Sequence, residues 1–98
     1  MRLQILQVPD CPNAALLRQR LAQALGENNV EVAVRVIADV DEAAAAGMAG
    51  SPTLLVDGVD PFAEPGCVPS VSCRLYRDVD GHVSGAPSMT ALREILDG

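Results

Sequence analysis

Apolar residues recur along the chain with two different periods, and each change of period marks a predicted element. An apolar run over residues 3–8 is typical of a strand. Residues 12–25 place apolar side chains on one stripe and arginine or glutamine on the other, which predicts an amphipathic helix. Pro12 suits the first position of this helix, and Gly26 followed by Asn28–Asn29 predicts its end.

A second strand and a second helix follow. Residues 30–37 alternate valine with Glu31, Ala33 and Arg35, which is the period of a strand. Because a helix joins the two strands, we expect them to be parallel, with a right-handed crossover. Residues 39–49 are rich in alanine and begin with acidic side chains, and this pattern predicts a helix whose dipole favours those acids.

The second half of the chain predicts two further strands and a last helix. Residues 51–56 are short and apolar, and residues 59–69 hold three prolines with no periodicity, so we expect a strand and then an ordered loop. In residues 71–76, Val71, Cys73 and Leu75 alternate with polar residues and Tyr76, which predicts a fourth strand with Cys73 facing inward. Ser88 is a candidate cap for a helix with an apolar face.

This order, β-α-β-α-β-β-α, indicates an α/β protein with one sheet and helices on both faces. The 98 residues fit a single domain, 1–98. The net charge of -6 argues against nucleic acid or an anionic membrane as a partner. There is no signal-peptide core or apolar span, and an odd number of cysteines, three, favours a reducing compartment. We therefore expect a cytoplasmic protein.

Cys11 is the residue with the clearest candidate chemistry. It lies between the end of a predicted strand and the start of a predicted helix, where backbone N–H groups and the helix dipole stabilise a thiolate. Thiol-disulfide enzymes usually have a second cysteine three residues on, but that residue here is Ala14. The negative charge of Asp10 opposes a second negative charge on the sulfur. The site has an attacking thiol and no local resolving thiol.

Two motifs resemble those of the thioredoxin superfamily, and its glutaredoxin-like branch in particular. Cys11-Pro12-Asn13-Ala14 resembles the Cys-Pro-aromatic-Cys motif without its second cysteine and its aromatic residue. Gly50-Ser51-Pro52-Thr53 resembles the cis-proline signature that precedes the third strand. The order of elements agrees over essentially the whole chain. The chain is also similar to small bacterial thioredoxin-like proteins of the type associated with organomercurial lyase.

The resemblance implies a thioredoxin-like, three-layer α/β/α fold with a four-stranded mixed sheet. It implies that Cys11 is the catalytic nucleophile and that a cis Ser51–Pro52 bond lies beside it. The backbone of Ser51 would then pair with an extended peptide or with glutathione. Substrate-binding residues implied by the motifs are Pro12, Asn13, Ser51, Pro52, Thr53 and Gly85. The absence of lysine removes one usual partner of the glutathione carboxylate.

Three functions stay open on this evidence. The first is a redox enzyme, a thiol-disulfide oxidoreductase with a single active-site cysteine, which acts on thiol or disulfide peptides, proteins or glutathione. The second is a non-catalytic module that binds a partner through the groove at Pro52. The third is a thiol protein that captures a soft metal such as mercury. Cys67, Cys73 and His82 lack the paired spacings of a zinc site, and we interpret Cys73 as a core residue and His82 as a solvated one.

Overall fold

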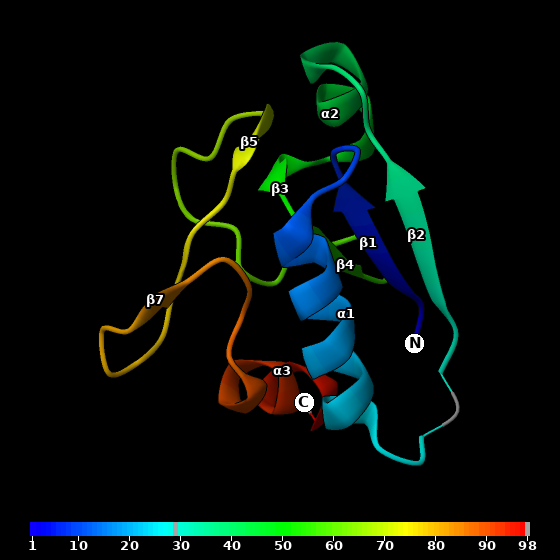
Figure 1. Ribbon diagram of the computed structural model, residues 1–98, viewed down its shortest axis with the longest axis vertical. Coiled ribbons are helices and arrows are strands. Elements are labelled where there is room, and N and C mark those ends of the chain that lie inside the picture. Colours follow the sequence, from blue (N-terminus) through cyan, green and yellow to red (C-terminus); the bar gives the residue numbers. More distant parts are fainter. Residues whose placement is uncertain (29, 98) are drawn as a thin grey trace.

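A three-stranded sheet lies at the centre of the computed structural model, which describes residues 1–28 and 30–97; Asn29, part of the predicted helix end, lies outside them. The strand order is β2 (Val32–Val36), β1 (Leu3–Gln7), β4 (Thr53–Val56). β1 is parallel to β2 and antiparallel to β4. The parallel pair agrees with the sequence prediction (Figure 1).

Helices pack on both faces of this sheet. α1 (Pro12–Leu25) and α3 (Met89–Asp97) contact each other and cover the face that carries Leu3 and Ile5. The opposite face carries Leu6 and packs against α2 (Val40–Ala46). Neighbouring residues of β1 therefore serve two separate apolar clusters, because successive side chains of a strand point to opposite faces.

The helix ends follow the signals in the sequence. Pro12 begins α1, and Gly26 follows its last residue with a φ of 57°. Asp39 caps α2, since its side chain accepts a hydrogen bond from the Glu42 N–H at 2.9 Å. The Ser88 hydroxyl accepts one from the Ala91 N–H at 3.1 Å and so caps α3. α2 is shorter than predicted, because Gly47 takes a left-handed conformation and ends it.

The prediction of a thioredoxin-like fold with a four-stranded mixed sheet is wrong. The expected third strand is divided at Pro52 into β3 (Ala49–Ser51) and β4, and β3 leaves the central sheet. The expected fourth strand is divided as well, into β5 (Ser70–Cys73) and β6 (Tyr76–Arg77). β5 pairs in parallel with β3, and β6 pairs with β7 (Val83–Ser84), so neither extends the central sheet.

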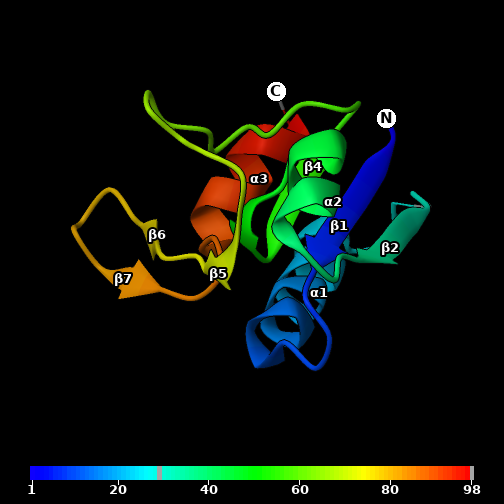
Figure 2. The ribbon, with the colours of Figure 1, turned by 90° about the horizontal axis from the view of Figure 1, so that it is seen from above.

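The side-chain phase of residues 73–76 is also the reverse of the prediction, whereas Val71 packs against the core as predicted. Tyr76 is buried and the Arg74 side chain is nearly so, whereas Cys73 is exposed and Leu75 is 70% exposed. The reason is the partner of Arg74, an aspartate in the preceding loop, which the alternation of apolar residues does not reveal. Figure 2 shows the β6–β7 hairpin at one end of the molecule and β2 at the other.

Candidate functional site

Cys11 lies where the sequence analysis expects it, in the short connection between β1 and α1. It is the residue that precedes the first turn of α1, and its carbonyl oxygen accepts the Ala14 N–H at 3.2 Å. Its thiol is free and makes no capping hydrogen bond, and the residue as a whole is 9% exposed. Asp10, just before it, has a φ of 56°, in the left-handed region. Cys11 is thus held at a helix N-terminus, with a small part of the residue exposed to solvent.

Ser51, Pro52 and Thr53 form the second part of the candidate site. The Ser51–Pro52 peptide bond is cis, and all three residues are buried. The Ser51 hydroxyl accepts a hydrogen bond from the Val8 N–H at 3.0 Å, which fixes this segment to the chain just beyond β1. The Thr53 hydroxyl donates to the Gly50 carbonyl at 2.7 Å. The first bond ties the proline segment to the connection that carries Cys11, and the second closes the turn around Pro52.

The chain's own residues 74–76 bind the proline segment along its length. The Arg74 N–H donates to the Ser51 carbonyl at 3.0 Å, and the Arg74 guanidinium donates to the Thr53 hydroxyl at 3.2 Å. The Tyr76 hydroxyl donates to the Pro52 carbonyl. The expectation that the Ser51 backbone is open for an extended peptide or glutathione is therefore wrong for this conformation, because β5 and the residue after it already occupy that edge.

A buried ion pair holds residues 74–76 in place. Arg74 and Asp60 are joined at 2.7 Å, with side chains 9% and 11% exposed. The guanidinium also donates to the Phe62 carbonyl at 2.9 Å and lies 4.7 Å from the centre of the Tyr76 ring. Phe62 and Tyr76 meet edge to face, with centroids 5.5 Å apart. Burial works to lower the pKa of Arg74, but its hydrogen bond to Asp60 and nearby negative charges raise it on balance.

Tyr76 provides a test of this arrangement at high pH. Burial raises the pKa of its hydroxyl above the ordinary value of 10.0, outweighing the attraction of Arg74 for a tyrosinate. The unfolded chain then loses this proton at lower pH than the folded chain. The contribution of the Tyr76 hydroxyl to the free energy of unfolding is therefore fully present below pH 10 and falls above it, by up to about 1.4 kcal/mol per pH unit. Tyr76 is the single tyrosine, so tyrosinate absorbance reports it directly. We expect a native transition well above 10 and a flatter pH dependence of unfolding in Tyr76→Phe; a native transition near 10 would contradict it.

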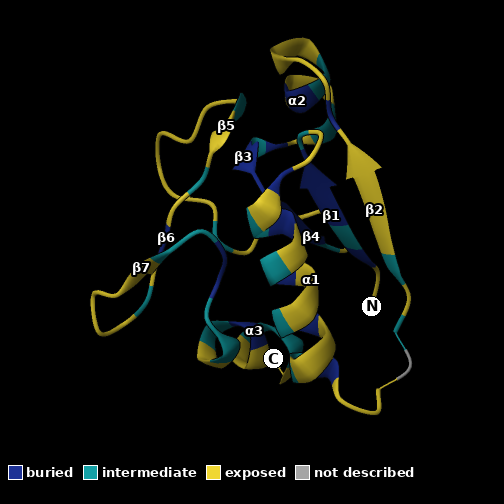
Figure 3. Cartoon of the chain, in the orientation of Figure 1, coloured by how far each residue is buried: buried dark blue, intermediate teal, exposed yellow. Residues whose placement is uncertain are grey.

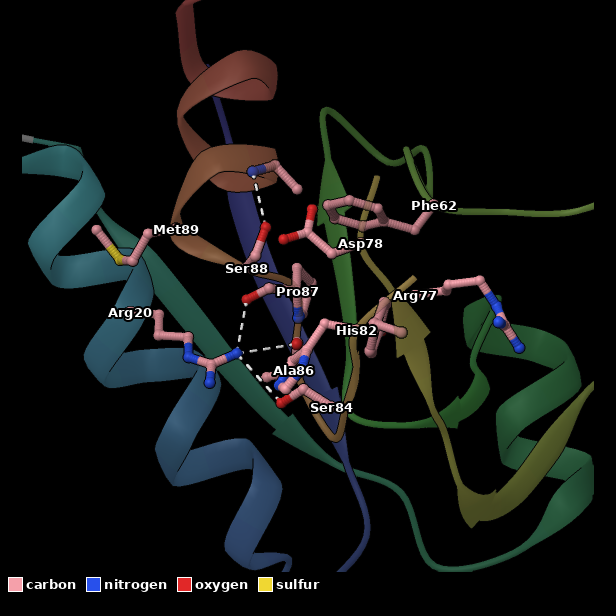
Figure 4. A pocket seen from close by; sticks show the side chains of 12 residues that line it. Arg20, Phe62, Arg77, Asp78, His82, Ser84, Ala86, Pro87, Ser88 and Met89 are labelled. Atoms are coloured by element: carbon pink, nitrogen blue, oxygen red, sulfur yellow. Dashed lines mark hydrogen bonds between the residues drawn. The ribbon is translucent and has the colours of Figure 1, made fainter. Parts of the chain in front are cut away.

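Gly85 lies against α1, beside the residues that follow Cys11. A Cβ placed on Gly85 would be 2.4 Å from the Asn13 Cγ, so the two residues are packed without spare room. Two turns further along α1, Arg20 donates through Nη1 to the Ser84 hydroxyl at 3.3 Å, the Ala86 carbonyl at 3.0 Å and the Pro87 carbonyl at 3.1 Å (Figure 4). The segment before α3 therefore contacts α1 at two points, Asn13 and Arg20. Gly85 lies at the end of α1 that carries Asn13 and begins after Cys11.

The contact between Gly85 and Asn13 predicts a non-additive pair of substitutions. Gly85→Ala is expected to lower the free energy of unfolding by about 1 to 2 kcal/mol, because its methyl group must displace the Asn13 side chain. In an Asn13→Ala background the same change should cost less than about 0.5 kcal/mol. Urea unfolding of the four proteins measures this coupling. Equal costs in the two backgrounds would show that Asn13 is not the obstacle.

Arg20 also borders a hollow of about 200 Å³ between the β6–β7 hairpin and the start of α3. Figure 4 shows the Arg20 side chain reaching the backbone of the segment before α3, with His82 and Ser84 of the hairpin beside it. His82 itself is exposed, as expected from the sequence. Neither Arg20 nor this hollow was expected from the sequence.

The other two cysteines differ in their relation to the proline segment. Cys67 is exposed in the loop of residues 60–69, where its sulfur accepts the Glu64 N–H at 3.2 Å. Cys73 is exposed in β5, and its register partner across the sheet is Ser51. The prediction that Cys73 is an inward-facing core residue is wrong. Within residues 1–28 and 30–97, no group of three histidine, cysteine or acidic side chains could hold a metal ion.

The network around Arg74 is the part of the site that the sequence analysis missed. Asp60 is fourteen residues from Arg74, and nothing local marks the two as partners. The available signal was the aromatic content, since Phe62 and Tyr76 are the chain's Phe and Tyr residues and they contact each other beside Pro52. Two aromatics at such positions favour a shared apolar contact over solvent-exposed sites.

Comparisons of this chain with protein-family models, with curated proteins and with solved structures gave no significant match. None of the helices in the described part of the chain is long and apolar enough to cross a membrane. The geometry above is therefore the basis for a functional proposal.

Proposed function

We propose that the protein carries out thiol-disulfide exchange with Cys11 as the attacking thiol. The observation that carries the proposal is the position of this sulfur. It is at the N-terminus of α1, where free backbone N–H groups and the positive end of a helix dipole stabilise negative charge in general, and 9% of the residue is exposed to solvent. Ala14, one turn into the same helix, is fully buried. The likeness of the Cys11-Pro12 and Ser51-Pro52-Thr53 motifs to those of the thioredoxin superfamily supports the same chemistry.

The reaction follows the chemistry of a single thiol. The Cys11 thiolate attacks one sulfur of a disulfide, a new sulfur–sulfur bond joins Cys11 to that half, and the other half leaves as a thiolate. An outside thiol, after losing its proton, then attacks the substrate sulfur that is bonded to Cys11. Cys11 leaves as a thiolate, and the two outside sulfurs form a disulfide. Cys11 is regenerated, the outside thiol is oxidised to a disulfide, and the half that left in the first step is reduced to a thiolate.

The covered edge at Ser51 restricts the class of substrate. A peptide that pairs with Ser51 as an added strand must first displace the Arg74 N–H, and with it the bonds of residues 74–76 to Pro52 and Thr53. Small or flexible disulfides, such as glutathione disulfide, need only reach Cys11 itself and do not have to pair with Ser51. We therefore place glutathione and short flexible peptides ahead of partners that bind by strand addition.

The compartment follows from the same thiols. Cys11, Cys67 and Cys73 are free, and a thiol nucleophile must stay reduced between turnovers. A reducing cytosol keeps such thiols reduced. We propose a cytoplasmic location on this ground.

The proposal is tested with a protein that retains Cys11 alone, made by Cys67→Ser and Cys73→Ser. Incubation with glutathione disulfide is expected to add one glutathionyl group at Cys11, and reduced glutathione is expected to remove it. The matched control retains Cys67 and Cys73 and carries Cys11→Ser. Mass spectrometry of the intact proteins follows both steps. No adduct at Cys11, or an adduct that forms no faster than in the unfolded protein, would overturn the proposal.

A further inference from the structure

The outer edge of β2 is open to pairing with another strand. Successive residues of a strand direct their backbone N–H and C=O groups to alternate sides. The Ile37 N–H donates to the Gln7 carbonyl at 2.7 Å, and Val36 is the register partner of Gln7. Odd-numbered residues of β2 therefore direct their backbone groups to β1. Val32, Val34 and Val36 direct theirs away from the sheet, because β2 is its terminal strand.

The side chains at this edge are more apolar than solvent exposure favours. Val34 is 44% exposed and Val36 is 52% exposed, and Figure 3 shows β2 exposed along most of its length. A groove of about 390 Å³ runs between β2 and α1 on the valine face of the strand. Leu21 and Val32 lie in its wall, and Val32 also packs against the core. The groove thus continues the hydrophobic core out to the open edge.

The opposite face of the strand carries charges in a self-complementary order. Glu31, Ala33 and Arg35 are all exposed, and the small residue lies midway between the acid and the base. If a second copy of the strand pairs antiparallel about Ala33, Glu31 of each copy lies opposite Arg35 of the other. This pairing forms two identical ion pairs, and Ala33 meets Ala33 on the axis without obstruction.

The same register matches the backbone and the apolar face. It places Val32 opposite the copy's Val34, and both direct their backbone groups outward, so they can exchange hydrogen bonds. It also brings a second row of valines over the groove beside α1. Shifting the axis to Val34 keeps the hydrogen bonding but places Arg35 opposite Ala33 and leaves the charges without partners. The charge order therefore selects Ala33 as the axis.

We propose that this edge binds a second copy of the chain, with antiparallel β2 strands joined across a two-fold axis at Ala33. The interface is isologous, since each copy presents the same surface. It converts two three-stranded sheets into one six-stranded sheet and covers the exposed edge of each copy. Because β2 and the β6–β7 hairpin lie at opposite ends of the molecule, the hairpin stays outside the interface (Figure 2).

Sedimentation equilibrium over a range of concentrations tests the proposal with a pair of charge reversals. The wild-type chain is expected to dimerise. Glu31→Arg and Arg35→Glu each place like charges opposite each other twice, so each should raise the dissociation constant at least about tenfold. The double variant, E31R with R35E, restores opposite charges and should recover most of the affinity. Arg77→Glu, an exposed reversal on β6, is the matched control and should leave the affinity unchanged.

Both substituted side chains are exposed, so circular dichroism should report an unchanged fold in every variant. A wild-type monomer at all concentrations up to about 1 mM would overturn the proposal, and the edge would then be free for a strand of another protein. A dimer that ignores the single reversals, or a double variant that stays dissociated, would also overturn it. Cys11→Ser should dimerise as wild type does, so this result is independent of the thiol chemistry.

Discussion

Arg74→Ala is expected to lower the free energy of unfolding by about 3 to 5 kcal/mol, the range typical of breaking a buried ion pair from one side. The substitution leaves the Asp60 carboxylate, 11% exposed, without its guanidinium partner. It also removes the donor to the Thr53 hydroxyl and the cation over the Tyr76 ring. A loss of this size multiplies the unfolded fraction by about two to four orders of magnitude. Denaturant titration followed by circular dichroism measures it.

Arg77→Ala is the matched control for this prediction, because Arg77 is exposed and three residues away on the same segment. It should change the free energy of unfolding by about 0.5 kcal/mol or less. The double variant of Arg74 and Asp60 should cost less than the sum of the two single changes, since neither charge is then left buried alone. If Arg74→Ala were no more destabilising than Arg77→Ala, the network could not be what holds residues 74–76 over Pro52.

Cys11→Ser is expected to reduce the rate of exchange with glutathione disulfide at least about a hundredfold, since a hydroxyl is not a nucleophile at neutral pH without an activating base. Cys67→Ser and Cys73→Ser should keep most of the rate, because the proposed cycle uses an outside thiol. The rate is measured from glutathione released under excess disulfide. A similar loss in Cys73→Ser would assign part of the chemistry to β5.

A substitution of Asp10 is expected to raise the reaction rate of Cys11. Asp10→Asn removes the negative charge of the residue that precedes Cys11 and should speed the reaction of the Cys11 thiol about two- to fivefold, because one negative charge fewer then opposes the attacking sulfur. Asparagine tolerates the positive φ of 56° at this position, so the backbone should be preserved. Asp41→Asn, on α2, removes the same charge elsewhere and should leave the rate unchanged. A slower reaction in Asp10→Asn would mean that the carboxylate assists the thiol.

Local signals predicted the three helices and the first two strands of this fold. Pro12 and Gly26 bound α1 in the structure as they do in the sequence, and Ser88 caps α3. The valine alternation predicted β2, and the helix between the strands predicted that it is parallel to β1. Each of these depends on residues within one or two turns or on one short connection. Such information is contained in a single sequence.

The sheet topology could not be predicted in the same way, because it depends on pairs distant in sequence. The bond from the Arg74 N–H to the Ser51 carbonyl joins residues twenty-three apart, and the ion pair with Asp60 decides which side chains of residues 73–76 are buried. Apolar periodicity alone placed Cys73 inside and Arg74 outside. The buried ion pair reversed that phase, since a charged side chain can be buried when its charge is matched.

The candidate site was predicted in part for the same reason. The position of Cys11 at the start of α1 and the cis Ser51–Pro52 bond each follow from a local motif, and the structure has both. The cover formed by residues 74–76 is a tertiary feature, and it changes the expected access to Ser51. The position of Cys11 was therefore available from the sequence, whereas its surroundings required the structure.

The central claim is that Cys11 is a reactive thiol, and its rate of alkylation in the native wild-type protein tests this most directly. Cys11 is buried whereas Cys67 and Cys73 are exposed, so exposure alone ranks Cys11 last. We expect the reverse at neutral pH: iodoacetamide should modify Cys11 first, as followed by peptide mass mapping over time, because its position at the start of α1 favours the thiolate. If Cys67 and Cys73 are modified while Cys11 stays intact until the protein unfolds, Cys11 is a structural residue and the account is contradicted.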